Sequence, residues 1–130
     1  MGQQQLLLII LGVIIVGVAI AVGITMFSGQ SIASNRDAIF MDLSTLGSDG
    51  YQWKIRPTMM GGGNGTYSGY NISVNSAWGT ENPNATYAVA TQTTTQFILT
   101  AASKQVAGAT CTITFDGNGK ITSGPTPSGF

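Results

Sequence analysis

The apolar run Leu6–Phe27 limits how this chain can fold more than any other feature of its sequence. It reads LLLIILGVIIVGVAIAVGITMF, and Thr25 is its only polar side chain. As an α-helix rising about 1.5 Å per residue it spans roughly 33 Å, enough to cross a hydrocarbon core of about 30 Å. Because the run is apolar on every face, we expect it to be surrounded by lipid or by other apolar helices.

Three interpretations of this run compete. A cleaved secretory signal has a basic start, a shorter apolar segment of about 7–15 residues and a small-residue cleavage site. Ser31-Ile32-Ala33 has the form of such a site, but the start MGQQQ has no Lys or Arg and the run is too long. A single-span membrane anchor and a helix that polymerises with copies of itself are the two other interpretations.

The residues after Phe27 continue a helical pattern with one apolar side. The spacing of three and four residues that indicates a helix joins the following side chains: Ile32, Arg36, Ile39, Phe40, Leu43 and Leu46. Gly47-Ser48-Asp49-Gly50 supplies the Gly-rich stop expected after a helix. We therefore predict a hydrophobic helix over residues 1–27 and an amphipathic continuation over residues 28–47, whose apolar stripe packs on the chain's own sheet.

The remaining residues, 48–130, predict a small antiparallel β-sheet head, which makes the fold class α+β. Gly61-Gly62-Gly63-Asn64-Gly65 is a flexible loop, and Asp116-Gly117-Asn118-Gly119 is a strong turn signal. Alternating β-branched and aromatic side chains predict strands over residues 67–74, 86–91, 96–101, 110–115 and 120–122. Cys111 falls on the apolar face of its strand, so we expect a buried side chain. The tail SGPTPSGF has no periodicity, and we expect it along the surface or against a neighbour.

The composition argues against catalysis, cofactors and nucleic acid. The 130 residues include five Lys plus Arg, five Asp plus Glu, no His and one Cys. Catalysis at neutral pH usually uses His, or carboxylates and Lys brought together, and the ten charges here are scattered. A single Cys excludes an internal disulfide and a Cys-rich metal site. The formal net charge of zero gives no electrostatic reason to expect nucleic acid. We expect no enzyme, no cofactor and no metal site.

Three Asn-x-Ser/Thr sequences make the head a candidate glycoprotein. The asparagines that would accept N-linked sugar are Asn64, Asn71 and Asn84. Such glycans are expected on surface loops outside the cell, in keeping with a head that is rich in Gly, Ser, Thr and Asn.

The order of these features resembles the type IV pilin superfamily, which includes pilins and pseudopilins. One region carrying the likeness is MGQQQLLLIILGVIIVGVAIAVGITMF with its amphipathic continuation to about Leu46. The other is QFILTAASKQVAGATCTITFDGNGK, similar to the family's late strands, where a cysteine-containing strand runs into an Asp–Gly turn. The resemblance implies a long N-terminal helix on a small sheet and an extracellular filament of identical subunits, as a divergent member of that family.

The resemblance also implies partners and assembly residues. A precursor inserted in the cytoplasmic membrane would meet a prepilin peptidase and the pilus assembly ATPase machinery. The family usually has a glutamate five residues into the mature chain, which pairs with a neighbour's N-terminal amine. If Met1 is the mature first residue, Gln5 stands there as the polar assembly contact; if processing follows Gly2, Leu7 does. The filament core would be Leu6, Leu7, Leu8, Ile9, Ile10, Leu11, Val13, Ile14, Ile15, Val16, Val18, Ile20, Val22, Ile24 and Phe27.

Two alternatives to this hypothesis stay open. In the first alternative, the chain is a minor pseudopilin of a secretion or pilus assembly system. In the second, it is a single-span membrane-anchored surface binding module. Adhesion, motility, DNA uptake and scaffolding all use similar shafts, so the sequence does not choose among these roles. The source, bacterial or archaeal, the mature N-terminus and the helical symmetry are equally open.

Overall fold

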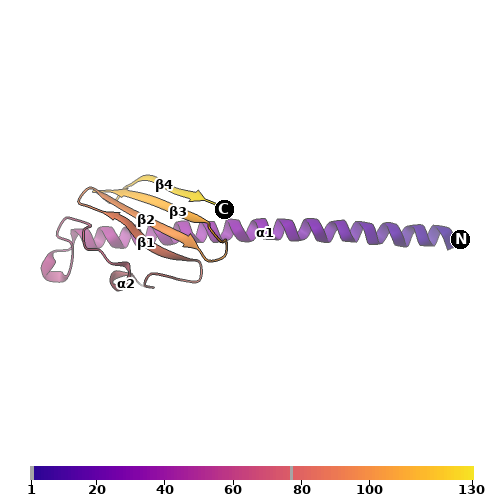
Figure 1. Cartoon of the computed structure of the whole chain (residues 1–130), viewed down its shortest axis with the longest axis horizontal. Coiled ribbons are helices and arrows are strands. Elements are labelled where there is room, and N and C mark those ends of the chain that lie inside the picture. The colour runs from indigo at the N-terminus through magenta and orange to yellow at the C-terminus, as the bar shows by residue number, and fades with distance from the viewer. Residues whose placement is uncertain (1, 77) are drawn as a thin grey trace. The chain divides into compact units, whose positions relative to one another are not determined.

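A computed structural model of the chain describes residues 2–76 and 78–130, which fall into two compact units. Met1–Ala33 is the N-terminal unit and Ser34–Phe130 is the sheet unit. The helix α1, Gly2–Ile55, contributes residues to both (Figure 1). The sheet unit packs the later part of this helix against four antiparallel strands, which confirms the predicted α+β class.

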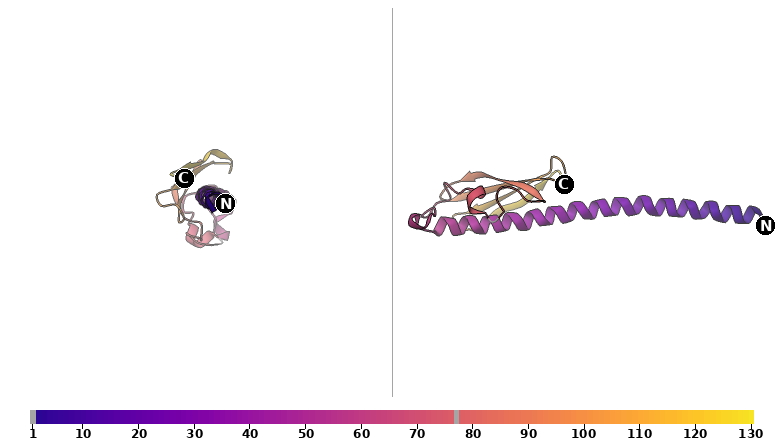
Figure 2. Two further views of the ribbon diagram at one scale, coloured as in Figure 1. Left: turned by 90° about the vertical axis from the view of Figure 1, so that its right-hand side faces the viewer. Right: turned by 90° about the horizontal axis from the view of Figure 1, so that it is seen from below.

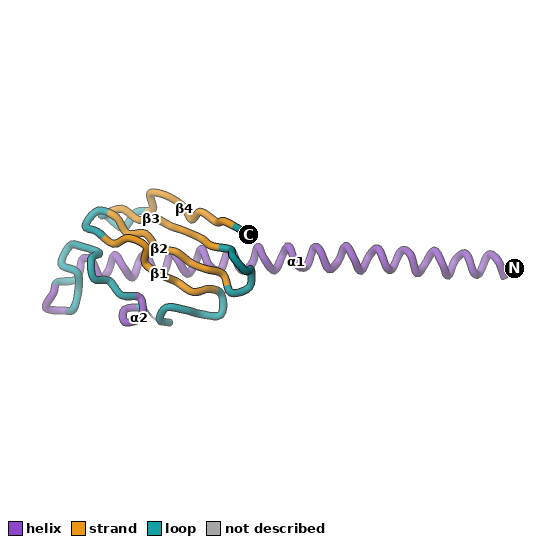
Figure 3. Tube along the Cα trace, in the orientation of Figure 1, coloured by secondary structure: helices purple, strands orange, loops and turns teal. Residues whose placement is uncertain are grey.

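The sheet is a meander in which each strand pairs with the next one along the chain (Figure 3). Its strands are β1 (Ala85–Gln92), β2 (Gln96–Ser103), β3 (Thr110–Asp116) and β4 (Ile121–Ser128). In β3 buried side chains alternate with half-buried ones, as the period of two of a strand requires. The predicted strands over 86–91, 96–101 and 110–115 are confirmed.

The core lies between the sheet and residues 34–55 of α1, which the sheet covers from one side (Figure 2). The helix buries one stripe at the spacing of three and four residues that aligns side chains on a single face. Its buried members are Asn35, Ile39, Leu43, Leu46, Gly47, Gly50, Trp53 and Lys54. Facing them, Tyr67 stacks on Phe97 with ring centroids 4.7 Å apart and planes 5° apart. The predicted amphipathic stripe is therefore the helix's contribution to the core.

The predicted end of the helix at residue 47 is wrong, because α1 continues to Ile55. Gly47 and Gly50 lie inside the helix, on the face toward the sheet. A Cβ atom on Gly47 would overlap the ring of Phe115, and one on Gly50 would overlap the ring of Phe97. These glycines let two aromatic rings approach the helix backbone, and they do not terminate it.

The Gly-rich loop after the helix satisfies the carbonyl groups that every helix leaves unpaired at its C-terminus. The backbone N–H of Gly63 donates to the carbonyl of Trp53 at 2.8 Å, and that of Gly65 donates to Lys54 at 2.7 Å. A short 3₁₀-helix, η1 (Thr58–Met60), lies between helix and loop. The sequence prediction of a loop is confirmed, and the loop acts as a cap for α1.

Two other predictions in the sheet unit are wrong. Residues 67–74 form no strand: they turn through the buried Tyr67 and Tyr70 into a short helix, α2 (Ile72–Asn75). The last strand, predicted over residues 120–122, is too short: β4 pairs with β3 through residue 128, so most of the tail is an exposed strand on the surface. Its Pro125 and Pro127 are tolerated because β4 is an edge strand, where a residue without an N–H can face outward.

Candidate assembly surface and a hollow at the sheet edge

Between Leu6 and Phe27 the N-terminal unit presents an apolar helical surface with a single polar side chain, Thr25. All fifteen predicted filament-core side chains are exposed, from 51% for Val22 to 77% for Phe27. Soluble monomers rarely expose apolar patches larger than a few hundred Å². The helix is long and apolar enough to cross a membrane by length and composition, and an 18-residue stretch of it has a mean hydropathy of 3.2. A signal sequence meets the same criterion.

One face of this helix is hollowed by glycine. A shallow groove of about 550 Å³ is lined by Ile9, Gly12, Val13, Val16, Gly17 and Ile20. Nothing lies within 4 Å of a Cβ built on Gly12 or Gly17. Small residues on an apolar helix allow a second backbone to approach closely. The groove therefore has the form of a helix-packing surface.

The polar residues of this unit are few, and two of them bear on assembly. The hydroxyl of Thr25 donates to the carbonyl of Val22 at 2.8 Å, so it is satisfied within the helix. Gln5, the predicted polar contact, is exposed in the first turns of α1. The amine of Met1, which the predicted contact involves in a neighbouring copy, lies outside the described residues.

In the sheet unit, one carboxylate joins the helix to the sheet. Oδ2 of Asp42 accepts hydrogen bonds from the Tyr87 hydroxyl at 2.5 Å, from Asn82 Nδ2 at 2.8 Å and from Asn84 Nδ2 at 3.2 Å. Burial, and then the hydrogen bond to Asp42, raise the pKa of Tyr87 above its usual value of 10.0. Three donors satisfy one half-buried carboxylate, so the cluster is structural support for β1 and the loop before it.

A buried lysine holds the β3–β4 turn. Lys54, in the last turn of α1, donates from Nζ to the carbonyl of Gly117, and Nζ lies 4.9 Å from the centre of the Tyr67 ring. The Tyr67 hydroxyl in turn donates to the carbonyl of Asp116 at 2.8 Å. Sequence reasoning missed Lys54, because a single Lys in the last turn of a helix is ordinary until its distant partner is known.

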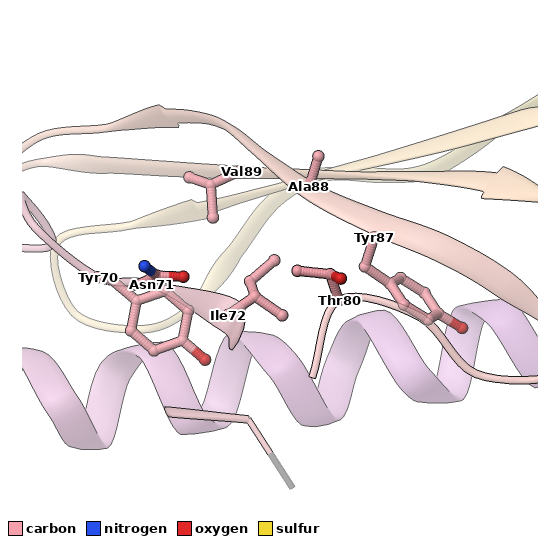
Figure 4. A pocket seen from close by; sticks show the side chains of 7 residues that line it. All are labelled: Tyr70, Asn71, Ile72, Thr80, Tyr87, Ala88 and Val89. Carbon is pink, nitrogen blue, oxygen red and sulfur yellow. The ribbon is translucent and has the colours of Figure 1, made fainter. Parts of the chain in front are cut away.

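A hollow of about 230 Å³ opens beside β1 (Figure 4). It is lined by Tyr70, Asn71, Ile72, Thr80, Tyr87, Ala88 and Val89. The hydroxyl groups of both tyrosines point away from Ala88 and Val89 in this view. The Tyr70 hydroxyl is buried without a hydrogen-bond partner in the described structure, and burial, then Asp49, raises its pKa to about 12. Apolar and aromatic surface therefore dominates the hollow.

The three candidate glycan acceptors have different surroundings. Asn64 is exposed in the Gly-rich loop, with a left-handed φ of 52°. Asn71 is exposed at the start of α2, and its Oδ1 accepts from the Ser73 N–H at 3.0 Å. Asn84 is half-buried, and its Nδ2 is one of the donors to Asp42. The sequence alone does not separate them.

Reactive chemistry is scarce in the same unit. Cys111 is 1% exposed, as predicted, and burial raises the pKa of its thiol to about 11, which keeps it protonated at neutral pH. In residues 2–76 and 78–130, no three His, Cys, Asp or Glu side chains group so as to hold a metal ion. The arrangement offers surfaces for packing.

Comparison with known proteins adds no family. No protein-family model, no curated protein and no solved structure matches the chain. The features of the chain that bear on its function are its surfaces: an exposed apolar helix in one unit, and a sheet with its own core in the other.

Proposed function

We propose that this chain is the structural subunit of an extracellular helical filament of type IV pilus-like design. The observation that carries the proposal is the surface of the N-terminal unit, where all fifteen predicted filament-core side chains are more than half exposed. Such a surface needs an apolar environment, and copies of the same helix provide one. The grooved face at Gly12 and Gly17 offers these copies a place of close approach.

The membrane serves as the store from which subunits are drawn. Lipid and a bundle of apolar helices are both apolar surroundings, so lateral transfer from one to the other exposes little of the helix to water. At about 25 cal/mol per Å², burial of some 2,000 Å² amounts to tens of kcal/mol relative to water, as an upper figure. Disassembly would then return subunits to lipid or detergent.

The sheet units would form the outer wall in this arrangement. Their cores are complete within one chain, so they need no partner to fold. Identical heads joined head-to-tail generate an open helical array when the rotation between copies does not close. Gln5 would supply amide hydrogen bonds within the bundle without a buried unpaired carboxylate. A prepilin peptidase and an assembly ATPase are the partners that this route requires.

The test introduces a charge into the proposed filament core. Ile15→Arg should abolish filaments in electron micrographs of material sheared from the cells of origin, because a guanidinium buried among apolar helices is unpaired. Gln52→Arg, at an exposed position of the sheet unit, is the matched control and should leave filament yield unchanged. A normal yield from the Ile15 variant would refute the proposal.

A second candidate is a single-span membrane-anchored binding module, favoured by the span-like length and hydropathy of the helix. It predicts particles of one subunit in detergent and no long fibres. A minor pseudopilin predicts short, rare filaments. Negative-stain imaging of sheared material, with the subunit quantified by mass spectrometry, separates the three.

A further inference from the structure

The three Asn-x-Ser/Thr sequences differ in whether the acceptor nitrogen is free. N-linked glycosylation attaches sugar to Nδ2 of the asparagine, and it requires a hydroxyl two residues later. In Asn84 that nitrogen donates to Asp42 Oδ2 at 3.2 Å, and the carbonyl of the same residue accepts from Asn35 Nδ2 at 3.3 Å. A glycan there would break a contact that holds the loop before β1 to the helix.

The other two sites differ in their hydroxyl groups. Thr66, two residues after Asn64, uses its hydroxyl oxygen to accept from the Ser68 N–H at 3.1 Å and from the Thr94 hydroxyl at 3.4 Å. Ser73 instead donates from its hydroxyl to Oδ1 of Asn71 at 2.8 Å. Only at Asn71, among the three, does the hydroxyl contact the amide that would be modified, and this side chain is exposed.

A seat for the first sugar lies next to Asn71, which is one of the residues lining the hollow at the sheet edge (Figure 4). Its volume of about 230 Å³ is below the range of about 300–1,000 Å³ typical of small-molecule pockets, so it suits a single ring. The Tyr87 N–H faces this edge and donates to the Thr80 carbonyl at 2.7 Å. By the alternation of a strand, the N–H of Val89 faces the same way and can meet a sugar oxygen.

We propose that Asn71 is the N-glycan acceptor of this chain, with the first sugar ring seated over the hollow beside β1, and that Asn84 stays unmodified. The donor is a lipid-linked phosphoryl sugar. Nδ2 of Asn71 bonds to the anomeric carbon, the bond from that carbon to phosphate oxygen breaks, the lipid phosphate leaves and the displaced amide proton passes to solvent. The inference shares with the proposed function only the exposure of the sheet unit outside the cell.

Glycopeptide mapping of the full-length subunit from its own cells tests the proposal. We expect the peptide containing Asn71 to carry hexose or N-acetylhexosamine mass, and the peptide containing Asn84 to be bare. A bare Asn71, or a glycan on Asn84, overturns the proposal. Electron microscopy of the same preparation separates the two hypotheses: filaments with a bare Asn71 overturn only the glycan, and glycosylated single subunits overturn only the filament.

Matched variants control for folding. Asn71→Ser keeps a side chain that can cap α2 but removes the acceptor nitrogen, so it should lose the whole glycan mass. Ser73→Ala should lose it as well, whereas Ser73→Thr keeps the required hydroxyl and should retain it. Amide hydrogen exchange at Val89 should be slower in the glycosylated chain than in Asn71→Ser. Equal exchange in the two would overturn the seat over the hollow.

Discussion

Residues 2–33 and 34–55 belong to one continuous helix, yet they hold opposite relations to the rest of the chain. The first part carries no charged side chain, and its large apolar side chains from Leu6 to Phe27 are all more than half exposed. The second part buries one stripe against a sheet and leaves its other faces to solvent. The helix is the same secondary structure in both. The difference lies in whether a partner for the apolar surface is encoded in the same chain.

The glycines of the two parts of the helix differ in the same way, in whether other residues of the chain pack against them. Gly12, Gly17 and Gly23 have nothing within 4 Å of a Cβ, whereas Gly47 and Gly50 have aromatic rings where a Cβ would be. The glycines in the second part thus contact aromatic rings of the sheet. A glycine in the first part leaves room that a neighbouring molecule can fill.

The largest expected effect separates the two parts through their apolar side chains. Phe97→Ala should lower the free energy of unfolding of the sheet unit by about 3–5 kcal/mol, because this buried ring contacts Tyr67, Tyr70 and Phe115. Leu11→Ala, at a side chain 54% exposed, should leave that free energy unchanged. Urea titration of the detergent-solubilised chain, followed by near-UV circular dichroism, measures both. A comparable loss in the two variants would contradict the division into units.

The paired glycines give the next effect. Gly47→Ala should destabilise the sheet unit by about 1–3 kcal/mol, because the new methyl group displaces the ring of Phe115. Gly12→Ala should instead stabilise the N-terminal helix by up to about 1 kcal/mol, since alanine has the higher helix propensity and open space surrounds it. Thermal unfolding in detergent, recorded by far-UV and near-UV circular dichroism, tests both signs. Two shifts of the same sign would disprove this account of the glycines.

The two buried tyrosines give a smaller effect that involves only the sheet unit. Tyr87→Phe should cost about 1–2 kcal/mol, because Asp42 loses a donor, while Tyr70→Phe should be neutral or stabilise by about 1 kcal/mol, because it removes an unpartnered hydroxyl. Both pKa values are raised in the folded state. Ionisation of either hydroxyl is therefore disfavoured in the folded state. The free energy of unfolding is unaffected by this ionisation below pH 10 and falls as the pH rises above it.

An alkaline titration checks this last prediction. Near-UV signals from the sheet unit should fall above pH 10, while the far-UV helical signal of residues 2–33, which have no titratable side chain, should persist in detergent. The two substitutions are compared separately, by the free energy of unfolding at neutral pH. If Tyr70→Phe lowers it as much as Tyr87→Phe does, the hydroxyl of Tyr70 has a hydrogen-bond partner in solution, and the prediction for Tyr70 is wrong.

The parts of the fold that could be predicted are those set by neighbours in sequence. The apolar run, the stripe through Ile39 and Leu43, and three strands follow from local periodicity. The helix end was missed because Gly47 has the composition of a stop, while its actual role depends on Phe115, 68 positions later. Strand β4 was cut short because its prolines argue against a strand unless its place at the sheet edge is known.

The candidate sites divide in the same way. The exposure of the fifteen predicted filament-core side chains could be predicted. The rest of the chain is too small to enclose a helix of this length that is apolar on every face. Lys54 with Gly117, and Asn84 with Asp42, join residues 63 and 42 positions apart, so they depend on tertiary structure. The hollow beside Asn71 likewise appears only when α2 and β1 come together.

Both outer edges of the sheet are blocked over part of their length. Along β4, Pro125 and Pro127 offer no N–H to an incoming chain. Along β1, Thr80 and Asn82 pair with Tyr87 and Ala85 of the strand itself. These blocks hinder copies of this protein from merging into one continuous cross-β ribbon. Any fibre they build should lack the 4.7–4.8 Å meridional reflection of amyloid and should come apart in detergent with every sheet intact.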